Sequence, residues 1–197
     1  MASFIGMDQP EHTGQRKAVA PIVAPTNLRN MEAVIRQRTE DVLDALPRNE
    51  TFDWVDKVSI ELTTMMLATL FDFPFEDRRM LTYWSDVATA DFDAPGALVK
   101  SDEERLEILK EMGQYMGKLW RQRADKDGGF DLISMLSQDA ATKDMSPMDL
   151  IANSTLLIVG GNDTTRNSMS GSIVATNRVP DELAKLRANP GILTSSF

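Results

Sequence analysis

The feature that most constrains this fold is a predicted helix of about thirty residues in the last third of the chain, long for a globular protein. Ser146 and Pro147 open it, because serine caps helices and proline is tolerated in the first turn, and Asp149 fits the acidic third position of a capping box. The segment continues to about Asn177 without another proline. We therefore expect one continuous helix that crosses the middle of the structure.

Helical periodicity also governs the rest of the chain. Apolar residues recur at steps of three and four, as a helix with one buried face requires. The predicted helices span 8–19, 26–46, 54–70, 75–84, 102–124, 131–136, 147–177 and 180–189. The stretch 88–101, which contains Pro95-Gly96, is predicted to be a long mobile loop. No segment keeps the alternation of a strand, so the predicted fold class is all-α, without repeats or linkers.

The first two helices carry specific expectations. Asp8 should cap the first, with Glu11 at the reciprocal capping-box position, and Thr26 should cap the second. The apolar positions of the second helix are expected to form one buried face: Leu28, Met31, Ile35, Val42 and Leu46.

Composition excludes several classes of function. The 197 residues include 30 acidic and 21 basic ones, a net charge of −9, which argues against nucleic acid as a partner. There is no cysteine, hence no disulfide, thiolate zinc site or cysteine nucleophile. The N-terminus has no signal-peptide pattern, and no run approaches the roughly 20 apolar residues of a membrane span. We expect a cytoplasmic protein without a membrane span.

The most informative segment lies inside the long helix. Gly160 and Gly161 are adjacent, and each glycine costs a helix roughly 1 kcal/mol relative to alanine. Asp163 and Thr164 follow directly, placing an acid and an alcohol beside the weakened turn. In one interpretation the helix ends at Gly160 and a polar loop follows. In the other, the missing side chains let a flat ligand approach the backbone, and Thr164 bonds back to the Gly160 carbonyl and opens the helix locally.

A second candidate site lies near the N-terminus. His12 and Arg16 are four residues apart and share a helical face, where two donors suit a carboxylate or a phosphate. His12 is the only histidine, and a lone histidine is more often a surface or cap residue than a ligand.

These two segments resemble the cytochrome P-450 family of haem-thiolate monooxygenases. The stretch 160–165 matches the small-Gly-x-acid-Thr-Thr/Ser signature of the family's long distal helix, and His12-x-x-x-Arg16 matches its propionate-binding motif. In the family that motif follows an Asp-Pro-Pro-like start, whereas Gln9 replaces the first of these prolines here. The resemblance extends over nearly the whole chain, residues 1–197.

The resemblance implies a cofactor and roles for the candidate residues. It implies haem b, with His12 and Arg16 on the propionates and Gly160 and Gly161 lining the distal groove. Thr164 would hydrogen-bond iron-bound dioxygen and Asp163 would relay protons, with electron donation from a proximal cysteine thiolate assisting O–O cleavage.

Shorter segments suggest a subfamily. Residues 23–25, 67–74 and 162–168 are similar to the bacterial soluble enzymes that hydroxylate terminal methyl groups of medium-chain alkanes. That likeness implies a hydrophobic substrate (an alkane or fatty acid), O2, a ferredoxin and ferredoxin reductase, and electrons ultimately from NAD(P)H. It leaves the substrate's chain length and the identity of the redox partner open.

The chain is expected to be a partial member of the family. Its N-terminal strands and its C-terminal cysteine loop are absent, so no axial metal ligand is present and the chain alone is predicted to be inactive. Residues 192–197 depart from the family pattern. With one side of the long helix uncovered, Leu157, Ile158 and Met169 are expected to be unusually exposed.

The competing hypothesis is a non-catalytic helical module that binds a ligand or a partner. It would account for the helices and for His12, but it gives no reason for two glycines beside Asp163 and Thr164. Flanking sequence with an in-frame cysteine loop would decide between the two.

Overall fold

A computed structural model describes residues 3–126 and 128–193, which contain helices and no strand. The α-helices are α1 Glu11–Val19, α2 Pro25–Asp44, α3 Glu61–Phe71, α4 Arg79–Ala88, α5 Asp102–Ala124, α6 Leu132–Gln138, α7 Pro147–Arg178 and α8 Pro180–Ala188. Short helices occur at η1 Phe4–Gly6, η2 Ala20–Val23, η3 Val55–Ile60, η4 Phe75–Asp77 and η5 Pro190–Leu193; η3 is a π-helix that leads into α3. The all-α prediction is confirmed. Residues 194–197, part of the segment expected to depart from the family pattern, lie outside the described residues.

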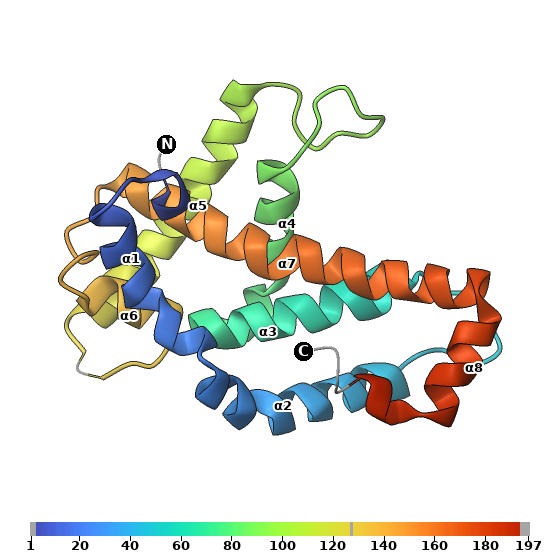
Figure 1. The fold of residues 1–197 in the computed structure, drawn as a ribbon. Coiled ribbons are helices and arrows are strands. Elements are labelled where there is room, and N and C mark those ends of the chain that lie inside the picture. The colour runs from blue at the N-terminus through green and yellow to red at the C-terminus, as the bar shows by residue number, and fades with distance from the viewer. Residues whose placement is uncertain (1–2, 127, 194–197) are drawn as a thin grey trace.

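The predicted long helix is α7, which crosses the middle of the molecule with α3 running alongside it (Figure 1). Its predicted cap is confirmed: Ser146 Oγ accepts from the Asp149 amide at 3.2 Å and donates to the Asp149 carboxylate at 2.7 Å. Helix α7 continues as an α-helix through Gly160 and Gly161. The interpretation that ends the helix at Gly160 is therefore wrong.

Helices α3 to α7 share one hydrophobic core. Its most enclosed side chains include Phe71, Leu81, Met112, Leu136 and Ile158, each no more than 2% exposed. Helix α5 has the predicted bounds and buries Leu109, Met112, Met116 and Leu119 as its periodicity requires. The expectation of unusual exposure is wrong for Ile158, which is 1% exposed and belongs to the hydrophobic core, and Leu157 and Met169 are half-buried. Ile173 and Val174, further along α7, are 37% and 50% exposed instead.

The first two helix starts differ from the predictions. Pro10 occupies the cap position of α1, and Asp8 makes no side-chain cap bond; only its backbone carbonyl accepts, from the His12 amide. Ala24 caps α2 with Pro25 at the first position, so Thr26 lies inside the helix. In both cases proline sets the start where a polar side chain was expected to.

The expected buried face of α2 is also wrong. Only Val42 is buried, Met31 and Leu46 are half-buried, and Leu28 and Ile35 are 45% and 39% exposed. Helix α2 lies at the lower border of the molecule in Figure 1, where it contacts α3, η2 and η3. Its apolar spacing therefore faces a side that no described element covers.

Ion pairs fix the start of α3. The Glu61 carboxylate forms ion pairs with Arg78, at 2.9 Å, and with Arg79. Arg79 also pairs with Asp56 of η3 at 2.8 Å. Burial raises the pKa of Glu61, but the hydrogen bonds and charges of Arg79 and Arg78 outweigh burial and hold that pKa below its ordinary value. The carboxylate therefore stays ionised and ties α3 to the segment that leads into α4.

The predicted loop is present between α4 and α5, at the upper edge of Figure 1. Arg105 of α5 anchors it by donating to the carbonyls of Val87 and Ala90, and its guanidinium lies 4.2 Å from the Phe92 ring centroid.

Among the helices described, none is long and apolar enough to cross a membrane.

Candidate functional site

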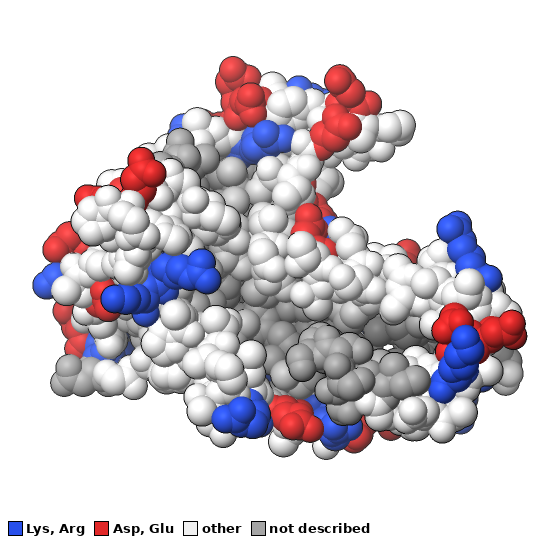
Figure 2. All heavy atoms as spheres, viewed as in Figure 1, with Lys and Arg blue, Asp and Glu red and all other residues white. Residues whose placement is uncertain are grey.

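The middle of α7 has one open face. Gly160 and Thr164 are one turn apart on it, both are exposed, and a Cβ added at Gly160 would meet no atom within 4 Å. The predicted back-bond is confirmed, since Thr164 Oγ1 donates to the Gly160 carbonyl at 3.2 Å. The helix is not opened by it: α7 keeps α-helical hydrogen bonding there. Figure 2 shows few charged side chains over the middle of α7.

Gly161 lies on a different face of α7, although it was predicted to line the distal groove together with Gly160. A Cβ at Gly161 would lie 2.6 Å from Cδ2 of Leu67 in α3, so this glycine allows two helices to touch. Successive residues of a helix are about 100° apart, which turns Gly161 away from the face of Gly160. Of the two glycines, only Gly160 borders open space.

Asn162 continues the packed side and was missed by sequence reasoning. It is fully buried, and its Oδ1 accepts from Thr63 Oγ1 at 2.8 Å across the α3–α7 contact. A buried amide between two helices fixes their register, because leaving its partner unpaired would be costly. An asparagine inside an apolar helix run was the available signal; its partner was not visible in the sequence.

Asp163 is held by a cation. Arg166, three residues on, pairs with Asp163 and also with Asp86 of α4 at 2.8 Å. Both pairs are partly shielded, with Arg166 14% and Asp163 21% exposed at their side chains. The Asp163–Arg166 spacing was visible in the sequence, but the bridge to Asp86 depends on how α4 packs.

Helix α1 and η1 are hydrogen-bonded to the buried Asn153 of α7. Asn153 Oδ1 accepts from the Phe4 amide at 2.8 Å, and its Nδ2 donates to Gln15 of α1 at 3.0 Å. Positions 153, 160 and 164 follow the steps of seven and four that define one helical face. Asn153 therefore lies along the same face as Gly160 and Thr164, about 10 Å nearer the start of α7.

His12 and Arg16 lie on α1. His12 is half-buried, 3.4 Å from the Gln9 amide through Nδ1 and 6.5 Å between ring centroids from Phe4. Arg16 is exposed, and no ion pair involves it within the described part of the chain. That the two residues face the same open space as Thr164 stays a prediction.

An apolar hollow adjoins the open face. Its volume is about 330 Å³, and it lies between the end of α4 and α7. It is lined by Ser3, Ala88, Thr89, Ala152, Thr155, Leu156 and Val159. Leu156 lies one turn before Gly160, so this edge of the hollow borders the open face, whereas Thr155 and Val159 lie further round α7.

The relatives found by sequence and the solved structures found by fold belong to the same kind of protein. No protein-family model matches the chain. Linalool 8-monooxygenase of Pseudomonas putida is 31% identical over 194 residues, which are 98% of this chain and 47% of that protein. Among solved structures, cytochrome P450-153 from Novosphingobium aromaticivorans is 48% identical with a TM-score of 0.85, and covers 96% of this chain and 45% of that one. A cytochrome P450 from Sphingomonas sp. PAMC 26605 is 50% identical with a TM-score of 0.84, over 96% and 47%.

The chain thus spans about half the length of the relatives that it matches, and its fold is a helical part of theirs. The predicted resemblance is confirmed by sequence and by structure. This chain belongs to the cytochrome P450 family.

Proposed function

We propose that this chain is part of a haem-thiolate monooxygenase and supplies the side of the haem on which O2 binds. The whole enzyme would insert one oxygen atom of O2 into a C–H bond at the terminal carbon of a medium-chain alkane or fatty acid. The open face of α7 carries the proposal, because Gly160 and Thr164 lie bare on it and adjoin an apolar hollow. The likeness to two P450 structures at 48% and 50% identity supports it.

The residues present fit a haem. The empty space over Gly160 admits a flat group against the helix backbone, which a large side chain at this position would obstruct. When bound, the haem iron supplies the oxygen-activating chemistry. His12 and Arg16 would hold its propionates from α1, which is hydrogen-bonded to α7 through Asn153. The chain has no cysteine, so the axial thiolate has to come from a segment outside these residues.

Thr164 and Asp163 would take part in proton transfer in this site. The Thr164 hydroxyl is held by the Gly160 carbonyl, which orients its oxygen lone pairs away from the helix. Asp163 lies beside it and, through Arg166, is poised between the site and α4. Proton delivery from Asp163 would require its carboxylate to leave Arg166 at least transiently.

Electrons would come from NAD(P)H through a ferredoxin reductase and a ferredoxin. The apolar lining around Leu156 and Val159 suits an alkyl substrate better than a charged one.

The test compares two adjacent threonines in the haem-loaded full-length enzyme. Thr164→Ala should raise the ratio of hydrogen peroxide to alcohol by about tenfold or more, because it removes a group that would take part in proton transfer. Thr165→Ala, off the open face, should leave the ratio unchanged. Equal ratios in both variants would remove Thr164 from the mechanism.

A second test addresses the chain alone. Reconstituted with haem, reduced and exposed to carbon monoxide, the 197-residue chain should show no thiolate-type absorption band, since it has no cysteine. A thiolate-type band would contradict the assignment of the axial ligand to another segment.

A further inference from the structure

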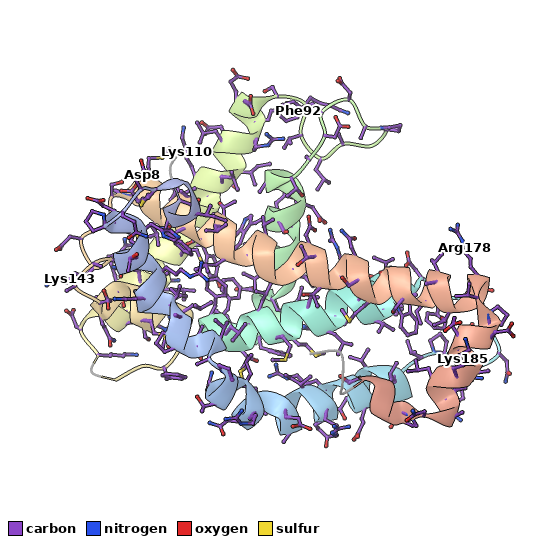
Figure 3. The ribbon with its side chains drawn as sticks, viewed as in Figure 1. Asp8, Phe92, Lys110, Lys143, Arg178 and Lys185 are labelled. Carbon is purple, nitrogen blue, oxygen red and sulfur yellow. The ribbon has the colours of Figure 1, made fainter. Side chains whose placement is uncertain are left out.

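A second hollow lies away from the open face of α7, where α5 crosses the first turns of α7. Its volume is about 420 Å³, within the range of small-molecule sites. Its apolar lining comes from Trp120, Met145, Pro147, Met148, Leu150 and Ile151. Figure 3 marks Lys110, another lining residue, on α5 near this crossing.

Two glycines of α5 shape the hollow differently. A Cβ at Gly113 would lie 2.4 Å from Ile151, so the two helices touch there. A Cβ at Gly117 would meet only Arg121 Nη1 at 3.5 Å and Leu150 at 4.0 Å, which are ordinary contacts. Gly113 is therefore needed for the packing of α5 on α7, whereas Gly117 leaves space beside α5 and forms the floor of the hollow.

The charged side chains that line this hollow are basic, although the chain carries a net charge of −9. Among its described lining residues, the charged ones are Lys110 and Arg121. Lys110 pairs with Glu107 at 2.8 Å. Arg121 folds back over Gly117 and has no hydrogen bond or ion pair to any described residue.

Arg123, two residues further on, shows the contrast. It donates to the Asp72 carboxylate at 2.8 Å and is only 13% exposed at its side chain. Arg121, by contrast, is exposed and lies beside the apolar floor at Gly117 without an anion, which leaves its five hydrogen-bond donors available.

We propose that this hollow binds an amphiphile with one anionic head, a long-chain carboxylate. The Arg121 guanidinium matches a carboxylate in a bidentate pair. The alkyl chain would lie on Gly117 between Trp120, Leu150 and the adaptable Met148. The site starts more than two turns of α7 before Gly160, so it is separate from the proposed oxidation site and does not depend on that proposal.

The experiment uses the haem-loaded full-length enzyme labelled with 5-fluorotryptophan. The ¹⁹F resonance of Trp120, identified by its loss in Trp120→Phe, is followed during titration with dodecanoate, dodecanol or dodecyltrimethylammonium. Dodecanoate should shift it saturably, and the other two should bind about tenfold more weakly or worse, as loss of a charge-assisted hydrogen bond predicts. No shift, or equal affinity for all three probes, would overturn the proposal.

Variants separate the head from the chain. Arg121→Gln should weaken dodecanoate about tenfold and leave dodecanol unchanged. Lys118→Gln, which removes an exposed cation of α5 outside the lining, should change neither. Gly117→Leu should fill the floor and abolish binding of dodecanoate, while Gly117→Ala, which only makes ordinary contacts, should fold normally and weaken it less. Unchanged dodecanoate binding in either Arg121→Gln or Gly117→Leu would contradict the assigned site.

Discussion

Gly160 and Gly161 are neighbours in the sequence, yet they do different things. Gly160 and Thr164 lie on an open face of α7, with no atom near the missing side chain. Gly161 and Asn162 lie on a packed face, against Leu67 and Thr63 of α3. The rotation of about 100° per residue separates the two functions completely.

Under the proposed function, the difference lets one helix serve as both scaffold and site. The packed face fixes α7 on α3, so that the open face is presented at a defined place and angle. A motif written as two small residues does not reveal this division, because glycine on one face avoids a clash with Leu67 and glycine on the other face borders open space.

The largest expected effect is a divergence in stability between the two glycines. Gly160→Ala should raise the free energy of unfolding by up to about 1 kcal/mol, the helix preference for alanine. Gly161→Ala should lower it by about 1–2 kcal/mol, since Leu67 is enclosed and cannot move aside freely. Urea unfolding of both variants measures the gap.

Leu67→Ala provides the control for this prediction. In a chain that carries Leu67→Ala, the clash is gone and Gly161→Ala should become neutral or stabilising. The same loss in both backgrounds would mean that Leu67 is not what requires a glycine at position 161.

A smaller effect is expected where the open and packed faces meet. Arg166→Gln breaks the pairs to Asp163 and Asp86, which should cost about 1 kcal/mol because the group is partly shielded. Arg36→Gln removes a pair to Glu32 whose side chains are 69% and 67% exposed, and should change stability by less than about 0.5 kcal/mol. Equal midpoints of thermal unfolding for the two variants would show that Arg166 does not hold α4 on α7.

The smallest effect concerns acid. Because the pKa of Glu61 is depressed in the folded chain, its ion pairs stabilise the fold above the unfolded value of about 4.3 and lose that contribution as the pH falls through the folded value. Glu61→Gln should therefore make stability less sensitive to pH between about 5 and 3, by under about 1 kcal/mol. Urea midpoints across this range test it, with Glu182→Gln, at an exposed pair to Lys185, as the control.

Elements whose ends carry local signals could be predicted from the sequence. Helix α5 has its predicted bounds, and α7 starts at the predicted Ser146 cap, because these depend on side chains within one turn. The start of α2 was wrong because Pro25 at the first position took precedence over Thr26. Its apolar residues recur at helical spacing, but the expectation that they are buried together was wrong, because burial depends on tertiary contacts that periodicity does not contain.

The site shows the same limit. The Thr164 bond to Gly160 follows from a spacing of four and was predicted. The contacts of Gly161 with Leu67, of Asn162 with Thr63 and of Arg166 with Asp86 join residues far apart in the chain. No local pattern identifies such partners, so the packed face appeared only in the structure.

The most direct test of the two-face account is the C–O stretching frequency of carbon monoxide bound to the reduced, haem-loaded full-length enzyme. Gly160→Ala should shift that frequency, because a methyl group would enter the space over the open face. Gly161→Ala, combined with Leu67→Ala to relieve the clash, should leave it where Leu67→Ala alone places it. A shift in the Gly161 variant, or no shift in Gly160→Ala, would contradict the division of α7 into a cofactor face and a packing face.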